Sequence, residues 1–129
     1  LPDNVKGIIA DSPFSTPIDI IRTVAVSMGI PKGIVGPLAT LAARLFGRFD
    51  LHGASALEAV KNAKTPILII HGEDDRFVPC DMGRAIHAAS PEGTELVTFP
   101  EAGHAISYLA DEPRYRSVIN RFWERVYEK

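Results

Sequence analysis

The unbroken apolar run Ile67-Leu-Ile-Ile70 constrains the fold more than any other segment of this 129-residue chain. A strand with one face in water alternates apolar and polar residues, whereas a strand covered on both faces is apolar throughout. The run therefore predicts an interior strand of a parallel sheet. It leads directly into the acidic turn Gly72-Glu-Asp-Asp75, so carboxylates follow the carboxyl end of that strand.

Other strands are predicted at about residues 5–10 and 95–99, beside the central strand at about 67–71. Apolar spacing and capping residues predict helices over about 17–28, 34–46, 55–63, 81–89 and 112–127. The predicted caps are Ser15 or Thr16 for the first helix, Ser55 for the third and Asp111 for the last. Alternating strands and helices imply parallel strands joined by crossover connections. The chain is therefore predicted to be one partial α/β domain over residues 1–129, with three parallel strands.

The connection between the first two predicted strands is much longer than the roughly dozen residues that a parallel crossover requires. We expect residues 15–64 or so to form a helical insertion that acts as a lid. The helix at about 34–46 is apolar around most of its circumference, so we expect it to be covered on several sides. Gly47 is predicted to end it as a C-terminal cap.

A second turn, Glu101-Ala-Gly-His104, follows the last predicted strand. Because catalytic groups collect beyond the carboxyl ends of parallel strands, we expect His104, the acidic turn and Asp11 to share one edge of the sheet. A carboxylate that orients an imidazole forms the acid and base of a nucleophile relay. Either Asp74 or Asp75 could supply this carboxylate, and the other is then expected to be its solvated neighbour.

These two turns resemble those of the alpha/beta-hydrolase superfamily. Gly72-Glu-Asp-Asp75-Arg-Phe-Val-Pro79 is similar to its acid turn, and Ala102-Gly-His104 is similar to its histidine turn. The resemblance covers the whole chain, as the last three strands, the lid and the final helix. The nearest groups are the serine-aminopeptidase-like and dienelactone-hydrolase-like bacterial hydrolases.

The resemblance implies that Asp75 and His104 are the acid and histidine of a Ser-Asp-His triad that hydrolyses ester- or amide-type bonds through an acyl-enzyme. The chain departs from the family pattern because it contains no Gly-x-Ser-x-Gly nucleophile motif. It begins at Leu1 without a methionine, close to a strand. We therefore expect a C-terminal fragment of a serine hydrolase, inactive alone and without a cofactor.

Several other residues carry side chains that could take part in chemistry. Ser12 in Asp-Ser-Pro is typical of a turn, Ser107 is expected to stabilise its loop, and Cys80 is expected to be structural although a helix start favours a thiolate. His71 is expected to be buried and hydrogen-bonded, His52 to lie in a loop and His87 on a helix surface. One set of ligand-type side chains matches no known metal motif, so no metal site is predicted: His71, Asp74, Asp75 and His104.

The formal net charge is −2 and basic residues are interspersed with acids, so neither nucleic acid nor a membrane is expected as a partner. The single cysteine, Cys80, excludes an internal disulfide and favours a cytoplasmic location. We expect a small ester or amide substrate in the parent protein, and a homodimer through the strand edge at 5–10 or through the lid. The alternative is a non-catalytic α/β ligand-binding or interaction module.

Overall fold

The computed structural model of the chain describes residues 4–51, 53 and 55–128. Strands β1 (Ile8–Asp11), β2 (Ile67–Gly72) and β3 (Thr94–Phe99) form a parallel sheet in the order β1-β2-β3. All six residues of the central strand β2 are buried. The predicted α/β class and the three parallel strands are confirmed, with strand bounds shifted by up to three residues.

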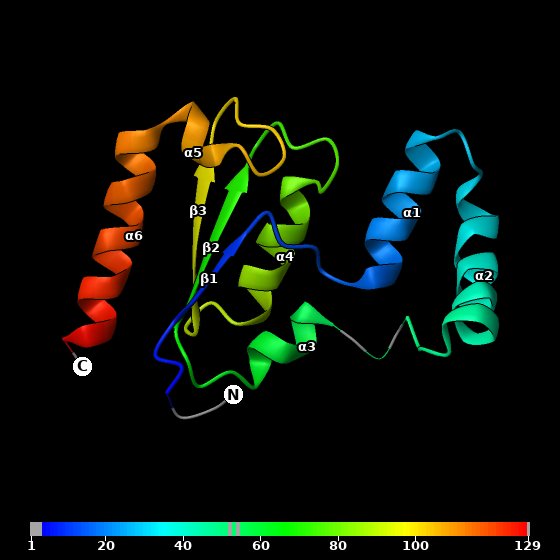
Figure 1. Cartoon of the computed structure of the whole chain (residues 1–129), viewed down its shortest axis with the longest axis horizontal. Coiled ribbons are helices and arrows are strands. Elements are labelled where there is room, and N and C mark those ends of the chain that lie inside the picture. The colour runs from blue at the N-terminus through cyan, green and yellow to red at the C-terminus, as the bar shows by residue number, and fades with distance from the viewer. Residues whose placement is uncertain (1–3, 52, 54, 129) are drawn as a thin grey trace.

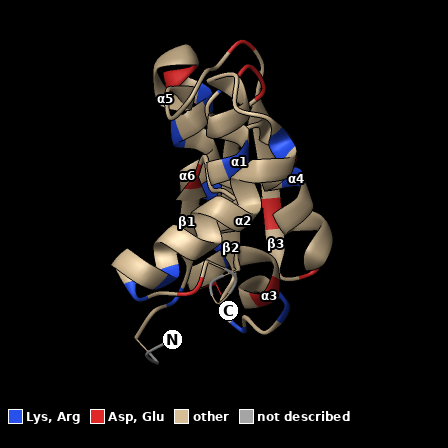
Figure 2. Ribbon diagram, turned by 90° about the vertical axis from the view of Figure 1, so that its right-hand side faces the viewer, with Lys and Arg blue, Asp and Glu red and all other residues tan. Residues whose placement is uncertain are grey.

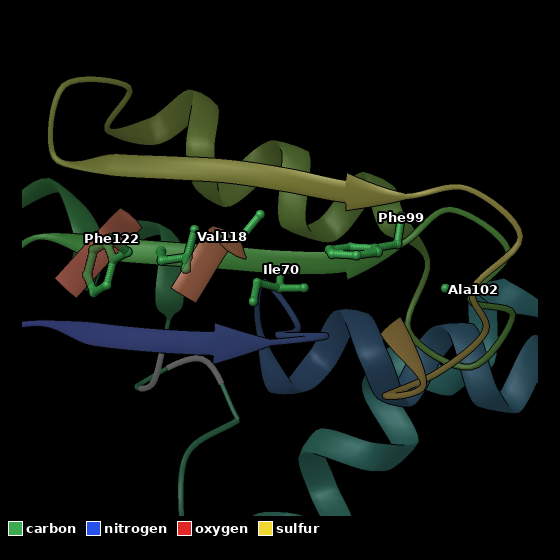
Figure 3. Packing of buried hydrophobic residues seen from close by; sticks show 6 residues of the cluster. Ile70, Phe99, Ala102, Val118 and Phe122 are labelled. Carbon is green, nitrogen blue, oxygen red and sulfur yellow. The ribbon is translucent and has the colours of Figure 1, made fainter. Parts of the chain in front are cut away.

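Helices cover both faces of this sheet (Figure 1). Helix α6 (Glu112–Tyr127) lies on one face, while α3 (Ala56–Lys61) and α4 (Cys80–Ala89) lie on the other. Alternate side chains of β2 serve the two cores, because successive residues of a strand point to opposite faces. Figure 3 shows the α6 side, whose labelled residues are Ile70, Phe99, Ala102, Val118 and Phe122.

Three helices begin at the capping residues that the sequence predicts. The Thr16 hydroxyl accepts the Asp19 N–H ahead of α1 (Pro17–Ser27), and the Asp111 carboxylate accepts the Arg114 N–H ahead of α6. Ser55 likewise accepts the Glu58 N–H at the start of α3. Each contact satisfies one N–H that the first turn of a helix leaves without an intrahelical partner.

Helices α1 and α2 (Lys32–Ala42) and the π-helical segment η1 (Ala43–Gly47) pack together and project from the sheet (Figure 1); we call them the arm. The predicted extent of the lid, about 15–64, stays a prediction. Helix α3 falls within that range, yet it packs on α4 and the sheet, with Val60 in the core. The arm is therefore the part that stands away from the domain body.

Two expectations about the arm are wrong. Helix α2 is not covered on several sides, because Gly36 and Ala39 pack toward α1 while a row of large apolar side chains stays 55–63% exposed: Ile34, Leu38, Leu41 and Leu45. The left-handed residue that ends the helix is Arg48, with φ 53°, instead of the expected Gly47.

A short helix that was not predicted, α5 (Ser107–Ala110), precedes α6. None of the helices in the described ranges has both the length and the apolar character needed to cross a membrane.

Candidate active site

Asp75 lies in the turn that follows β2, with its side chain fully buried. Its Oδ1 accepts the backbone N–H groups of Phe77 at 2.9 Å and Val78 at 2.8 Å. These bonds turn the other oxygen, Oδ2, toward the neighbouring loop. The adjacent Asp74 is exposed, as expected of the solvated member of the pair.

His104 comes from the turn after β3, and its Nδ1 lies 2.8 Å from Asp75 Oδ2. Since a carboxylate only accepts hydrogen bonds, His104 Nδ1 donates this one, and in the neutral ring Nε2 is therefore the nitrogen with the lone pair. The side chain of His104 is 41% exposed, in contrast to its buried partner. The Phe77 ring lies beside it, with ring centroids 5.1 Å apart. The imidazole is thus oriented from one side and accessible from another.

The two turns are held against each other by their backbones. The Glu73 N–H donates to Phe99 O at 2.9 Å, and the Asp74 N–H donates to Ala102 O at 3.0 Å. Gly72 permits this approach, because a Cβ on it would collide with the Ala102 carbonyl oxygen. The meeting of Asp75 and His104 therefore rests on main-chain contacts beyond the ends of β2 and β3.

His71 lies against the acid turn and forms a hydrogen bond with it. It is completely buried, and its Nε2 lies 2.9 Å from Val78 O and 3.7 Å from Asp75 Oδ2. A carbonyl oxygen only accepts, so Nε2 donates this bond. Val78 in turn donates its N–H to Asp75. The predicted buried, hydrogen-bonded role of His71 is confirmed.

Comparison with known proteins identifies the family of the chain. A model of the "Dienelactone hydrolase family" matches residues 34–128, which is most of the chain. The chain belongs to the dienelactone hydrolase family. Through this family the chain belongs to the alpha/beta-hydrolase superfamily, and its fold agrees.

Two Bacillus subtilis proteins are similar in sequence to this member of the family. YqkD is 22% identical over 125 residues, a match that covers 96% of this chain and 41% of YqkD. The hydrolase YugF is 36% identical over 61 residues, which covers 46% of this chain and 22% of YugF. The chain thus spans less than half the length of these curated relatives.

Solved structures show the same fold. An acylaminoacyl peptidase from Pyrococcus horikoshii superposes with a TM-score of 0.66 at 18% identity, over 99% of this chain and 20% of the peptidase. An esterase from Pyrococcus furiosus gives a TM-score of 0.66 at 20% identity, over 96% of this chain and 46% of the esterase. At such identities the likeness concerns the alpha/beta-hydrolase fold alone.

The other candidate residues lie apart from the Asp75–His104 pair, with one exception. Cys80 is buried at the start of α4, and burial raises the pKa of its thiol, which disfavours a reactive thiolate. Ser107 is fully buried and its hydroxyl has no partner among the described residues. Ser12, predicted as part of a turn, also accepts the N–H of Ala105, directly after His104.

Tyr115 makes a polar contact that the sequence did not indicate. Its apolar spacing on the last helix predicts a core position, and the ring does pack near Phe99, with centroids 5.8 Å apart. Its hydroxyl, however, donates to Asp11 Oδ2 at 2.9 Å. The two residues are 104 positions apart, so no local pattern could have indicated the bond.

The remaining histidines do not join the site. His87, predicted on a helix surface, is half-buried and bonded through Nδ1 to Thr94 Oγ1 at 2.8 Å. That expectation is wrong because α4 packs against β3. His52 lies outside the described residues. Within the described ranges, no three His, Cys, Asp or Glu side chains are arranged to hold a metal ion.

A hollow of about 540 Å³ occurs at the opposite end of the sheet. It is lined by Pro66 and Ile67 at the start of β2, by Gly93 and Thr94 at the start of β3, and by Arg125 of α6. His104 lies beyond the other end of these parallel strands, so this hollow is not part of the Asp75–His104 site.

Proposed function

We propose that this chain provides the acid, Asp75, and the base, His104, of a Ser-Asp-His triad in a serine hydrolase. The observation that carries the proposal is the 2.8 Å hydrogen bond between a fully buried carboxylate and a partly exposed imidazole. The bond fixes the tautomer that leaves Nε2 free to take a proton. The substrate class is a small ester or amide.

In the proposed mechanism, His104 Nε2 removes the proton of a serine hydroxyl as that oxygen attacks the substrate carbonyl. Asp75 stabilises the imidazolium that forms and keeps the ring in place. His104 then protonates the leaving alcohol or amine, which leaves an acyl-enzyme. Water, activated by the same imidazole, hydrolyses this intermediate and restores the serine.

The nucleophile is proposed to lie upstream of these 129 residues in the full-length protein. The chain has no Gly-x-Ser-x-Gly sequence, and it covers 41% of the relative YqkD. In alpha/beta hydrolases the serine precedes the acid and the histidine in chain order. The 129-residue chain by itself is accordingly expected to be inactive.

Ester hydrolysis and labelling by a fluorophosphonate probe test this proposal in the full-length protein. We expect Asp75→Asn to lower kcat by about four orders of magnitude, because the amide no longer favours the Nδ1–H tautomer of His104. His104→Ala should abolish labelling. The matched control is Asp74→Asn, which changes the exposed neighbouring carboxylate and should leave kcat within about twofold.

Two results would contradict the proposal. One is equal activity of the Asp75→Asn and wild-type proteins. The other is absence of labelling in the wild-type full-length protein, which would instead support a non-catalytic binding or interaction module.

A further inference from the structure

Ser12 makes a long-range contact with the histidine turn. Its Oγ accepts the backbone N–H of Ala105 at 3.2 Å, although the two residues are 93 positions apart. Ser12 is buried at the carboxyl end of β1, where its own N–H donates to Ile70 O at 2.9 Å. The first strand of the chain is therefore bonded directly to the residue that follows His104.

The direction of the hydrogen bonds around Ser12 is fixed by Asp11. Asp11 Oδ1 accepts the Ser12 hydroxyl proton at 3.2 Å, while Oδ2 accepts the Tyr115 O–H at 2.9 Å. Because a carboxylate only accepts, the Ser12 hydroxyl donates to it and leaves its lone pairs for the Ala105 N–H. Burial, together with the neighbouring Asp11, raises the pKa of Tyr115 to about 12, so Tyr115 stays a donor at neutral pH.

The backbones of Ser12 and Ala105, at the two ends of this contact, adopt strained conformations that surrounding contacts must stabilise. Ser12 has φ 51° and Ala105 has φ 54°, both in the left-handed region that residues with a Cβ seldom occupy. Such backbones persist where surrounding contacts over-determine them, and they concentrate near functional sites. Here the two left-handed residues are bonded to each other, and one is adjacent to the catalytic base of the proposed function.

We propose that Ser12, itself oriented by Asp11 and Tyr115, is a positioning residue. It holds the backbone conformation of the histidine turn and thereby the orientation of His104. This inference rests on the proposed function. Ser12 touches neither reacting atoms nor substrate; it acts through the Ala105 amide. The two turns beyond β2 and β3 fix His104 from the acid side, and Ser12 fixes the same loop from β1.

The test uses the full-length protein with Ser12→Ala and Ser12→Gly. Alanine loses the hydroxyl and keeps a strained backbone, whereas glycine loses the hydroxyl and accommodates φ 51° without strain. We expect both variants to lower kcat by about tenfold with KM within about twofold, because a catalytic group displaced by about 1 Å costs about a hundredfold and the loss of this bond should displace His104 by less. Tyr115→Phe should give a smaller loss, since Asp11 still accepts from Ser12.

The matched control is Ser107→Ala, which removes a buried serine hydroxyl near the same turn that has no partner among the described residues. It should leave kcat unchanged. A second measurement is the low-field proton resonance of His104 Nδ1–H in protein labelled with ¹⁵N-histidine, assigned by its loss in His104→Ala. We expect this resonance to weaken or shift in both Ser12 variants and to persist in Ser107→Ala.

The results separate this inference from the proposed function. If wild-type protein is active and both Ser12 variants keep kcat and the His104 resonance, the positioning role of Ser12 is wrong. A normal kcat for Ser12→Gly with a low kcat for Ser12→Ala would also overturn it, because the effect would then come from strain. If wild-type protein is inactive, the proposed function fails, and the resonance alone decides whether Ser12 positions His104.

Discussion

Asp75 and His104 differ in their exposure to solvent, and the difference suits their proposed roles. A buried carboxylate with three N–H donors around it is held in one orientation. An imidazole that is 41% exposed can meet a hydroxyl from another segment. The positions of the acid turn and the histidine turn relative to β2 determine both the burial of Asp75 and the exposure of His104.

At the residue scale we predict a pH-dependent contribution from Tyr115. Burial, followed by the hydrogen bond to Asp11, raises its pKa to about 12 in the folded chain, against about 10 for an unfolded tyrosine. A raised pKa means that the protonated form stabilises the fold, so the contribution is complete below about pH 10 and is lost as the pH rises through about 12.

The measurement compares the free energy of unfolding of wild-type and Tyr115→Phe protein from pH 7 to pH 11. The difference should be constant up to about pH 10 and then shrink. A difference that grows with pH would show that the phenol is not held as a donor to Asp11.

At the scale of elements, the position of α4 on the sheet depends on the contact between Gly83 and His71. A Cβ on Gly83 would lie 2.5 Å from His71 Nδ1, so α4 approaches β2 closely at this point. His71 then reaches Val78, and Val78 reaches Asp75. The position of α4 on the sheet is therefore linked to the geometry of the acid turn.

We predict that Gly83→Ala destabilises the protein by about 1–3 kcal/mol, because the added methyl group forces His71 or α4 to move. Urea unfolding measures the effect. The matched control is Gly33→Ala in α2, where a Cβ meets nothing within 4 Å and alanine should be neutral or slightly stabilising. Equal stability of Gly83→Ala and wild-type protein would contradict the close seating of α4.

At the scale of the whole molecule, the arm carries an apolar surface that the described part of the chain leaves open. Ile34, Leu38, Leu41 and Leu45 recur at helical spacing on α2 and η1, each more than half exposed. The ribbon of α2, which contains Lys32 as its single charged residue, is almost uniformly tan in Figure 2. Contiguous apolar surfaces of this kind promote association.

We predict that the 129-residue chain forms a homodimer, through this surface of the arm or through the outer edge of β1. Light scattering should report a dimer for the wild-type chain. Leu38→Gln with Leu41→Gln should give a monomer if the arm is the interface and should leave the dimer intact if β1 is the interface. A monomer of the wild-type chain at high concentration would show that neither surface associates.

Much of the fold could be predicted from local patterns. The apolar run at Ile67–Ile70, the capping residues Thr16, Ser55 and Asp111, and the alternation of elements define parallel strands and helices because they act within a few residues. The acid and histidine turns could be predicted to share an edge because parallel strands end on the same side of a sheet. The resemblance to a hydrolase acid turn singled out Asp75 over Asp74, and Asp75 is the buried one of the two.

The sequence by itself therefore determined the class of fold and indicated the pair Asp75 and His104, because both can be recognised from short segments. Tertiary structure alone decided that Ser12 reaches the histidine turn, that Tyr115 reaches Asp11, that His71 meets Gly83, and that one face of α2 stays open. Those contacts join residues far apart in the chain or depend on the approach of packed elements. Local spacing carries no signal for such distances, because they are set only when helices and strands pack into a common core.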